Sequence, residues 1–232
     1  MTGTIVNAAA IIAGAVVGLF LRTGIQERYK DIIMQGLGLS VLLIGMKMAF
    51  KTNNELLVIL SLVIGAIIGE WLDIDRFLEA LGQRLQAMIG SREGEFVRGF
   101  VSASLIYCVG AMAIMGPIES GLTGQHKVLY VKSALDGISA IIFSSTMGLG
   151  VVFSALPVFV YQGSITLLAG AVKALLTEAI IAELTATGGI LIVAIGLNVL
   201  GIKQIKVANL LPAVLVVVIL TSMVARFFPG LV

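Results

Sequence analysis

Long apolar runs separated by short polar stretches dominate this chain. Most of the runs approach the ~20 residues that an α-helix needs to cross a bilayer. The runs are continuous rather than alternating, so they predict membrane helices and not the strands of a barrel. The candidate spans cover residues 3–21, 32–50, 56–71, 97–115, 128–155, 158–176, 188–201 and 210–227. We therefore predict an all-α polytopic membrane protein with about seven or eight transmembrane helices.

Residues 73–95 follow a different pattern. Apolar side chains recur at helical spacing from Ile74 to Ile89, and charged and amide side chains occupy the opposite side. Such a helix lies in the membrane surface or against a partner. A plain connector between two halves of the chain is the alternative.

Two parts of the chain share a pattern. The matching segments are Ala13-Gly14-Ala15-Val16 with Ala169-Gly170-Ala171-Val172, Gly38…Ile44-Gly45 with Gly189…Ile195-Gly196, and Glu55-Leu56-Leu57 with Asn209-Leu210-Leu211. Weak internal symmetry is typical of secondary transporters. We predict a three-helix repeat at 3–72 and again at 157–229, with a central broken-helix pair at 96–156. Two spans between the copies would make the second copy run in the opposite direction, so that the repeats are inverted. The alternative is that the shared segments arise by coincidence, because the chain uses few residue types.

Composition excludes several classes of protein. Hydrophobic residues make up 59% and charged residues 12% of the chain, and mean hydropathy is +1.10. Globular domains carry about 25% charged residues, so the whole chain reads as one membrane domain in the lipid bilayer. The net charge of +2 does not favour nucleic-acid binding. A single Cys108 and a single His126 show no catalytic or metal-ligand spacing, so we expect neither an enzyme nor a bound cofactor.

Basic residues give a weak indication of orientation. With the N-terminus outside, nine Lys and Arg residues fall in inner loops and six on the outer side. Positive charge favours the cytoplasmic side. The chain is therefore expected to have its N-terminus outside.

Charged residues inside a bilayer are expensive and indicate candidate functional sites. Lys132 and Asp136 are four residues apart, hence on one face of a helix. Glu119 follows Gly116-Pro117, where we expect the preceding helix to break or kink. Unwound backbone next to a carboxylate is suited to Na⁺, a proton or a polar solute. Mutual neutralisation of Lys132 and Asp136, and a solvated Glu119, are the alternatives.

Further polar residues complete the predicted site. Asn7 and Gln162 lie near the starts of two equivalent spans, where a site on a two-fold axis would place them. Tyr107, Ser144 and Ser145 add hydroxyls. Serines in membrane helices often bond to their own backbone instead.

Four stretches resemble a known family. They are Gly3–Asn7, Tyr107–Gly121, Lys132–Gly137 and Tyr161–Gly163. Together they resemble the YdfK-like family of bacterial membrane proteins (domain of unknown function 554). The resemblance implies a compact polytopic protein of the bacterial inner membrane and supplies no substrate.

The favoured function is secondary transport of a small polar or ionic solute, with Na⁺ or H⁺ as the coupling ion. A scaffold or accessory subunit, and an ion channel, are the rival hypotheses. Gly14-xxx-Gly18 and Gly65-xxx-Gly69 have the small-residue spacing that lets helices approach closely. Through these faces we expect a homo-oligomer.

Overall fold

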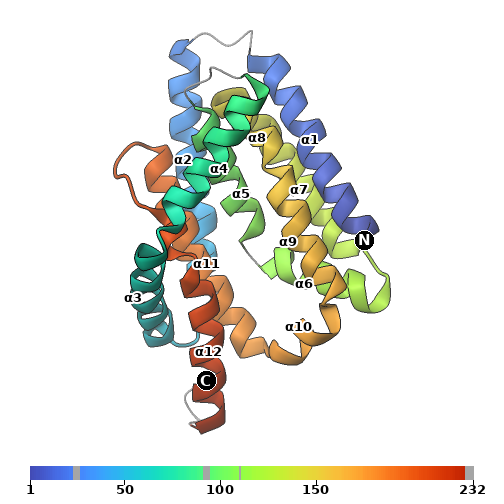
Figure 1. Cartoon of the computed structure of the whole chain (residues 1–232), viewed down its shortest axis with the longest axis vertical. Coiled ribbons are helices and arrows are strands. Elements are labelled where there is room, and N and C mark those ends of the chain that lie inside the picture. The colour runs from blue at the N-terminus through green and yellow to red at the C-terminus, as the bar shows by residue number, and fades with distance from the viewer. Residues whose placement is uncertain (23–26, 91–94, 110, 228–232) are drawn as a thin grey trace. The chain divides into compact units, whose positions relative to one another are not determined.

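The computed structural model describes residues 1–22, 27–90, 95–109 and 111–227, with the backbone alone at 27, 30, 111, 174 and 175. These residues form helices and no strand (Figure 1). The helices are α1 (Thr2–Arg22), α2 (Glu27–Ala49), α3 (Glu55–Leu72), α4 (Ile74–Ile89), α5 (Phe96–Cys108), α6 (Ala111–Thr123), α7 (Lys127–Met147), α8 (Gly150–Phe153), α9 (Ala155–Leu167), α10 (Ala169–Leu175), α11 (Glu178–Val199), the 3-10 helix η1 (Val207–Leu210) and α12 (Pro212–Phe227). The predicted all-α class is confirmed.

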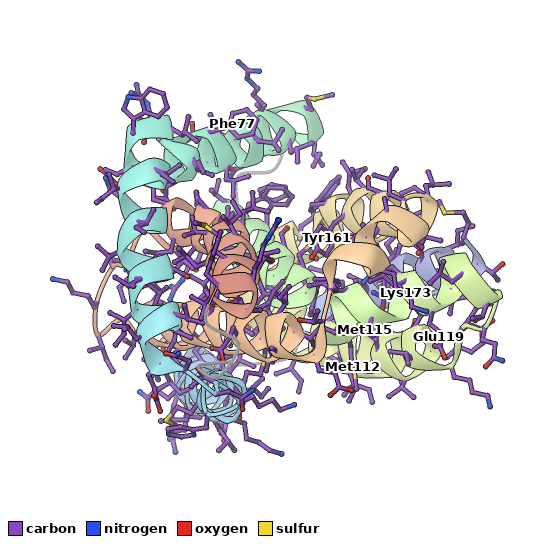
Figure 2. The ribbon with its side chains drawn as sticks, turned by 90° about the horizontal axis from the view of Figure 1, so that it is seen from below. Phe77, Met112, Met115, Glu119, Tyr161 and Lys173 are labelled. Carbon is purple, nitrogen blue, oxygen red and sulfur yellow. The ribbon has the colours of Figure 1, made fainter. Side chains whose placement is uncertain are left out.

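The helices have the length and polarity of membrane spans. Among the described residues, seven helical segments are long and apolar enough to cross a bilayer, and the bent pair α5–α6 would make an eighth. The side chains that project from the helices are mostly hydrocarbon (Figure 2). Large apolar residues such as Phe20 and Trp71 are exposed, as expected where lipid rather than water is the surrounding medium.

The chain divides into two compact units. Unit 1 comprises Met1–Leu37, Glu79–Cys108 and Met112–Lys173, and unit 2 comprises Gly38–Leu78, Val109–Ala111 and Ala174–Val232. The helices α2, α4, α6 and α10 each contribute residues to both units.

In unit 1, α1 packs along α7 in the same direction. A Cβ at Gly14 would lie 2.1 Å from the Gly137 carbonyl oxygen, and one at Gly18 would lie 2.3 Å from that of Ile141. The contact advances by four residues on both helices, which makes them parallel. Only glycine permits so close an approach of two backbones.

The helix break in the fourth span lies earlier than predicted. Helix α6 runs through Pro117 without interruption, and the break falls between α5 and α6, whose axes differ by 59°. Proline removes one hydrogen bond, but packing holds α6 on both sides of it. Gly116 lies against Leu129, and Gly121 lies against Thr166.

Three other boundaries matter for the fold. The predicted interruption of the fifth span is confirmed, because α7 ends at Gly148, whose φ of 76° is left-handed. The span at 158–176 is divided into α9 and α10 at Leu168. The span at 188–201 begins ten residues earlier than predicted, since α11 starts at Glu178 after the N-cap Thr177.

In unit 2, α2 and α11 cross in opposite directions. A Cβ on any of four glycines would clash with the other helix, and the pairs are Gly38 with Leu200, Leu42 with Gly196, Gly45 with Val193, and Ala49 with Gly189. An offset of 151 residues relates Gly38 to Gly189 and Gly45 to Gly196. Applied to both members, this offset turns the pair Gly38–Leu200 into Gly189–Ala49. It likewise turns the pair Leu42–Gly196 into Val193–Gly45. The two helices therefore cross at equivalent positions.

The small-residue faces are occupied within the chain. In unit 2, Gly65 lies against Ala213 and Gly69 against Asn209, while Gly14 and Gly18 contact α7 in unit 1. These faces are thus not free to join two copies. The predicted homo-oligomer would need another surface.

Candidate functional site

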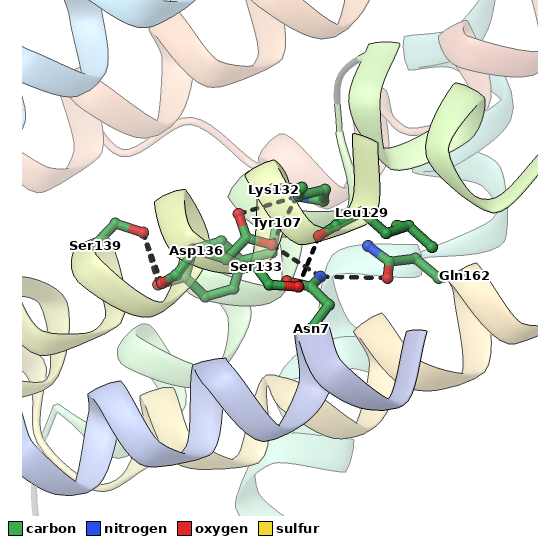
Figure 3. Close-up of polar contacts among 8 residues, drawn as sticks. All are labelled: Asn7, Tyr107, Leu129, Lys132, Ser133, Asp136, Ser139 and Gln162. Atoms are coloured by element: carbon green, nitrogen blue, oxygen red, sulfur yellow. Dashed lines mark hydrogen bonds and ion pairs between the residues drawn. The ribbon is translucent and has the colours of Figure 1, made fainter. Parts of the chain in front are cut away.

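A cluster of buried polar side chains lies inside unit 1. It joins Asn7 on α1, Lys132 and Asp136 on α7, and Gln162 on α9 (Figure 3). Helix α1 runs antiparallel to α9, because Thr4 pairs with Thr166 and Asn7 with Gln162. Three helices therefore present polar side chains to one another in the interior.

Lys132 and Asp136 form a buried ion pair on one face of α7. The Lys132 Nζ lies 2.7 Å from Oδ2 and 3.0 Å from Oδ1 of Asp136. Their side chains are only 7% and 10% exposed. In surroundings of low dielectric constant, an unpaired charge would carry a large desolvation penalty, which the opposite charge offsets.

Asn7 bridges the ion pair to the neighbouring helix. Its Nδ2 donates to Asp136 Oδ2 at 3.0 Å and to Gln162 Oε1 at 3.2 Å. Both amide hydrogens are thereby used. The adjacent carboxylate fixes the orientation of the amide, since the Asn7 oxygen would be repelled in that place.

Within the described part of the chain, two atoms of this cluster have no hydrogen-bond partner. They are the Asn7 Oδ1, an acceptor, and the Gln162 Nε2, a donor, and both side chains are fully buried. An unmet buried polar group costs about 1–3 kcal/mol. An acceptor and a donor are thus available beside a charged pair.

Tyr107 on α5 extends the cluster. The Ser139 hydroxyl donates to the Asp136 backbone oxygen at 2.9 Å and lies 3.4 Å from the Tyr107 hydroxyl. Because serine has a single hydroxyl hydrogen, Tyr107 can donate its own to Ser139. The ring is fully buried and packs edge-on against Phe143. Ser139 therefore links the Tyr107 hydroxyl to the backbone oxygen of Asp136.

Three predicted site residues do not join this cluster. Glu119 is half-buried on α6 (Figure 2), and its Oε2 lies 3.5 Å from the Val128 backbone nitrogen, in the first turn of α7. Ser144 and Ser145 bond to the carbonyl oxygens of Gly148 and Ile142. They lie two turns beyond Asp136 on α7, about 12 Å away at 1.5 Å per residue. The local alternative considered for these serines is the one observed.

A second buried carboxylate, Glu183 in unit 2, was not predicted from the sequence. Glu183 on α11 is 1% exposed and accepts hydrogen bonds from the backbone amides of Asn53 and Asn54, at 2.7 and 3.1 Å, and from the Thr52 hydroxyl. Its partners form the turn between α2 and α3. An acid inside an apolar run would have been noticed had α11 been predicted to begin before residue 188.

A third polar group, which is the second in unit 2, includes a salt bridge at the surface. Glu70 pairs with Lys206 at 2.7 Å and with Asn209 at 2.6 Å, and Asn209 Oδ1 accepts from the Asp75 backbone amide. The hydrogen bond and the charge of Glu70 raise the pKa of Lys206 above its usual value. Glu70 and Lys206 are exposed, whereas Asn209 is buried and fixes the start of α4, so the group is a structural cap.

The sequence of the chain matches one protein family. The family described as "Protein of unknown function (DUF554)" matches residues 2–222. The chain belongs to this family. It is 35% identical over 220 residues to the uncharacterized membrane protein YdfK of Bacillus subtilis (strain 168). The matched region covers 93% of this chain and 93% of YdfK. It is 29% identical over 231 residues to the uncharacterized protein YqgA of Escherichia coli (strain K12), covering 97% of this chain and 98% of the relative.

No solved structure matches the chain significantly. The resemblance stated from the motifs is confirmed, and the chain is a membrane protein. Because the names of these relatives carry no activity, the function has to be argued from the site.

Proposed function

We propose that this chain is a secondary transporter of a small polar or ionic solute across the bacterial inner membrane. The polar cluster of Asn7, Lys132, Asp136 and Gln162 would bind the solute. The observation that carries the proposal is an ion pair buried within a candidate span and joined to two side chains that retain unused hydrogen-bonding atoms. A charge in a membrane helix costs roughly 2.5–3.5 kcal/mol on insertion scales, and a purely structural cluster gains nothing from incomplete hydrogen bonding.

The internal repeat expected from the sequence would support this proposal. Equivalent helices α2 and α11 cross at equivalent residues in unit 2. In unit 1 the offset between the Ala-Gly-Ala-Val segments relates Asn7 to Gly163, the neighbour of its hydrogen-bond partner Gln162. Secondary transporters with inverted repeats bind solutes where the repeats meet. An inverted repeat would make both pairs of equivalent helices antiparallel, and we propose that the chain has this arrangement.

A coupling ion would act at Asp136. This carboxylate accepts hydrogen bonds from both Lys132 and Asn7. Binding of Na⁺ or H⁺ would weaken its pairing with Lys132 and release the ammonium group toward the solute. The ion and the solute would then be linked through one side chain.

The proposal is tested with the purified full chain. We expect at least one member of a panel of inorganic ions, amino acids and small organic acids to raise its unfolding temperature. Asp136→Asn should remove that effect, whereas Thr4→Val, on the same α1–α9 interface, should retain it. If no member of the panel raises the unfolding temperature and proteoliposomes take up none of them, solute transport is refuted.

The scaffold alternative has one supporting observation. The amphipathic helix α4 exposes Phe77 (66% exposed; Figure 2) and Met88 (85%). These side chains fit insertion into the membrane surface, which a transporter also requires. A scaffold would tolerate the double variant Lys132→Met with Asp136→Leu, which leaves no buried charge without a partner, whereas a transporter would lose solute binding. The double variant therefore separates the two functions.

A further inference from the structure

The hydrogen-bonding inventory of the cluster restricts what it can bind. On one side, Lys132 Nζ has Asp136 as its only partner in the described structure, and Gln162 Nε2 has none. Both are donors. On the other side, Asn7 Oδ1 has no partner and Asp136 has acceptor capacity left, because each carboxylate oxygen offers two lone pairs. The site thus offers donors and acceptors together.

We propose, as an extension of the transport function above, that the solute is a small zwitterion carrying a carboxylate and an ammonium group, such as an α-amino acid. The carboxylate would accept from Lys132 and Gln162. The ammonium group would donate to Asn7 Oδ1 and Asp136. Both unpartnered atoms are then satisfied by one molecule, and the ion pair is exchanged for two new ones.

Simpler ligands leave part of the site unmet. An inorganic cation would engage Asn7 and Asp136 but leave the Gln162 donor unpaired. A simple anion would engage Lys132 and Gln162 but leave the Asn7 acceptor unpaired. A buried group without a partner lowers affinity. The net neutral charge of the pair also favours a solute that is itself neutral overall, because transferring it into the protein adds no uncompensated charge.

The competing explanation is a closed amide pair. A small rotation of Gln162 would bring its Nε2 to Asn7 Oδ1, and no ligand would then be required. The two explanations differ in their response to solute. A closed pair is unaffected by glycine, whereas an open site is stabilised by it.

The test compares glycine with its two halves. Unfolding temperatures of the full chain are measured with glycine, acetate and methylammonium at equal concentrations and matched ionic strength. At about 100 times its Kd, glycine should raise the temperature by roughly 5 °C or more. Acetate and methylammonium should each give much less, even when they are added together.

Two variants assign the contacts. Gln162→Glu keeps the Oε1 that accepts from Asn7 but replaces the free donor, so it should reduce the affinity for glycine at least tenfold. Asn7→Leu should have a similar effect by removing the free acceptor. Thr4→Val is the matched control and should bind glycine as the parent does. The unfolding temperature without solute reports whether each variant is folded.

The outcomes separate the two proposals. If acetate or methylammonium alone stabilises the chain as well as glycine does, and Asp136→Asn abolishes the effect, the zwitterion inference is overturned while transport stands. The zwitterion inference is also overturned, and transport again stands, if Gln162→Glu is folded and binds glycine as the parent does. If nothing in the wider panel binds, the failure is that of the transport function.

Discussion

Glu183 on α11 accepts a hydrogen bond from the backbone amide of Asn53 at 2.7 Å, across a separation of 130 residues. Asn54, the N-cap residue of α3, donates to the same oxygen. A single carboxylate of α11 therefore holds the turn that ends α2 and begins α3. Negative charge at a helix N-terminus is favourable, and burial keeps water from replacing it.

Removing this carboxylate should destabilise unit 2. We expect Glu183→Ala to lower the free energy of unfolding by about 2–4 kcal/mol, because three part-buried donors lose their buried acceptor. Thermal or detergent-induced unfolding followed by helicity measures the change. Glu178→Ala is the matched control, an exposed acid five residues earlier on α11, and should change stability by less than ~1 kcal/mol. Equal losses in the two variants would contradict the role assigned to Glu183.

Much of the fold was predictable because membrane helices are defined by continuous apolar length. The starts and ends of α1 and α3 match the predicted ranges within one residue, and α4 covers the predicted amphipathic pattern from Ile74 to Ile89 but not the whole range 73–95. The interruption at Gly148 was also predictable, since glycine tolerates the left-handed backbone found there. These features depend on local sequence alone.

Other features depend on neighbours distant in sequence. Pro117 was expected to end a helix, yet α6 continues because Leu129 and Thr166 pack against its glycines. The pairing of Lys132 with Asp136 was readable from their spacing, but the bridge from Asn7 to Gln162 was not. Glu119 and Ser144 were grouped with Asp136 by polarity, and the structure gives them local partners instead. Polarity identifies candidates, and packing decides which of them meet.

The parallel contact of α1 with α7 depends on Gly14. Gly14→Ala should destabilise the chain by about 1–3 kcal/mol, since its Cβ would lie 2.1 Å from the Gly137 carbonyl oxygen. Gly36→Ala is the matched control, because a Cβ there meets nothing within 4 Å. It should be neutral or stabilising by up to ~1 kcal/mol, as alanine favours helix. Unfolding curves of the two variants check the contrast, and a neutral Gly14→Ala would mean that the helices are less closely packed than described.

The ion pair of α7 should behave differently in stability and in function. Either Asp136→Asn or Lys132→Met leaves one buried charge without its partner, and we expect a loss of about 3–5 kcal/mol. The double variant, Lys132→Met with Asp136→Leu, removes both charges and should recover most of that stability. Solute-induced stabilisation should be absent from all three variants. A double variant that still binds solute would show that the pair is only structural.

The antiparallel crossing of α2 and α11 makes a prediction about topology. Lys51 follows α2 and Lys203 follows α11, and both are exposed. Because the two helices run in opposite directions, these residues lie at opposite ends of the pair, and they should face opposite sides of the membrane. In a Cys108→Ser background, a membrane-impermeant thiol reagent applied to intact cells should label Lys51→Cys and spare Lys203→Cys, given the outside N-terminus favoured by the distribution of basic residues. Permeabilised cells, in which both cysteines should react, provide the control. Labelling of only Lys203→Cys would reverse the orientation and keep the inverted arrangement, whereas labelling of both in intact cells would contradict it.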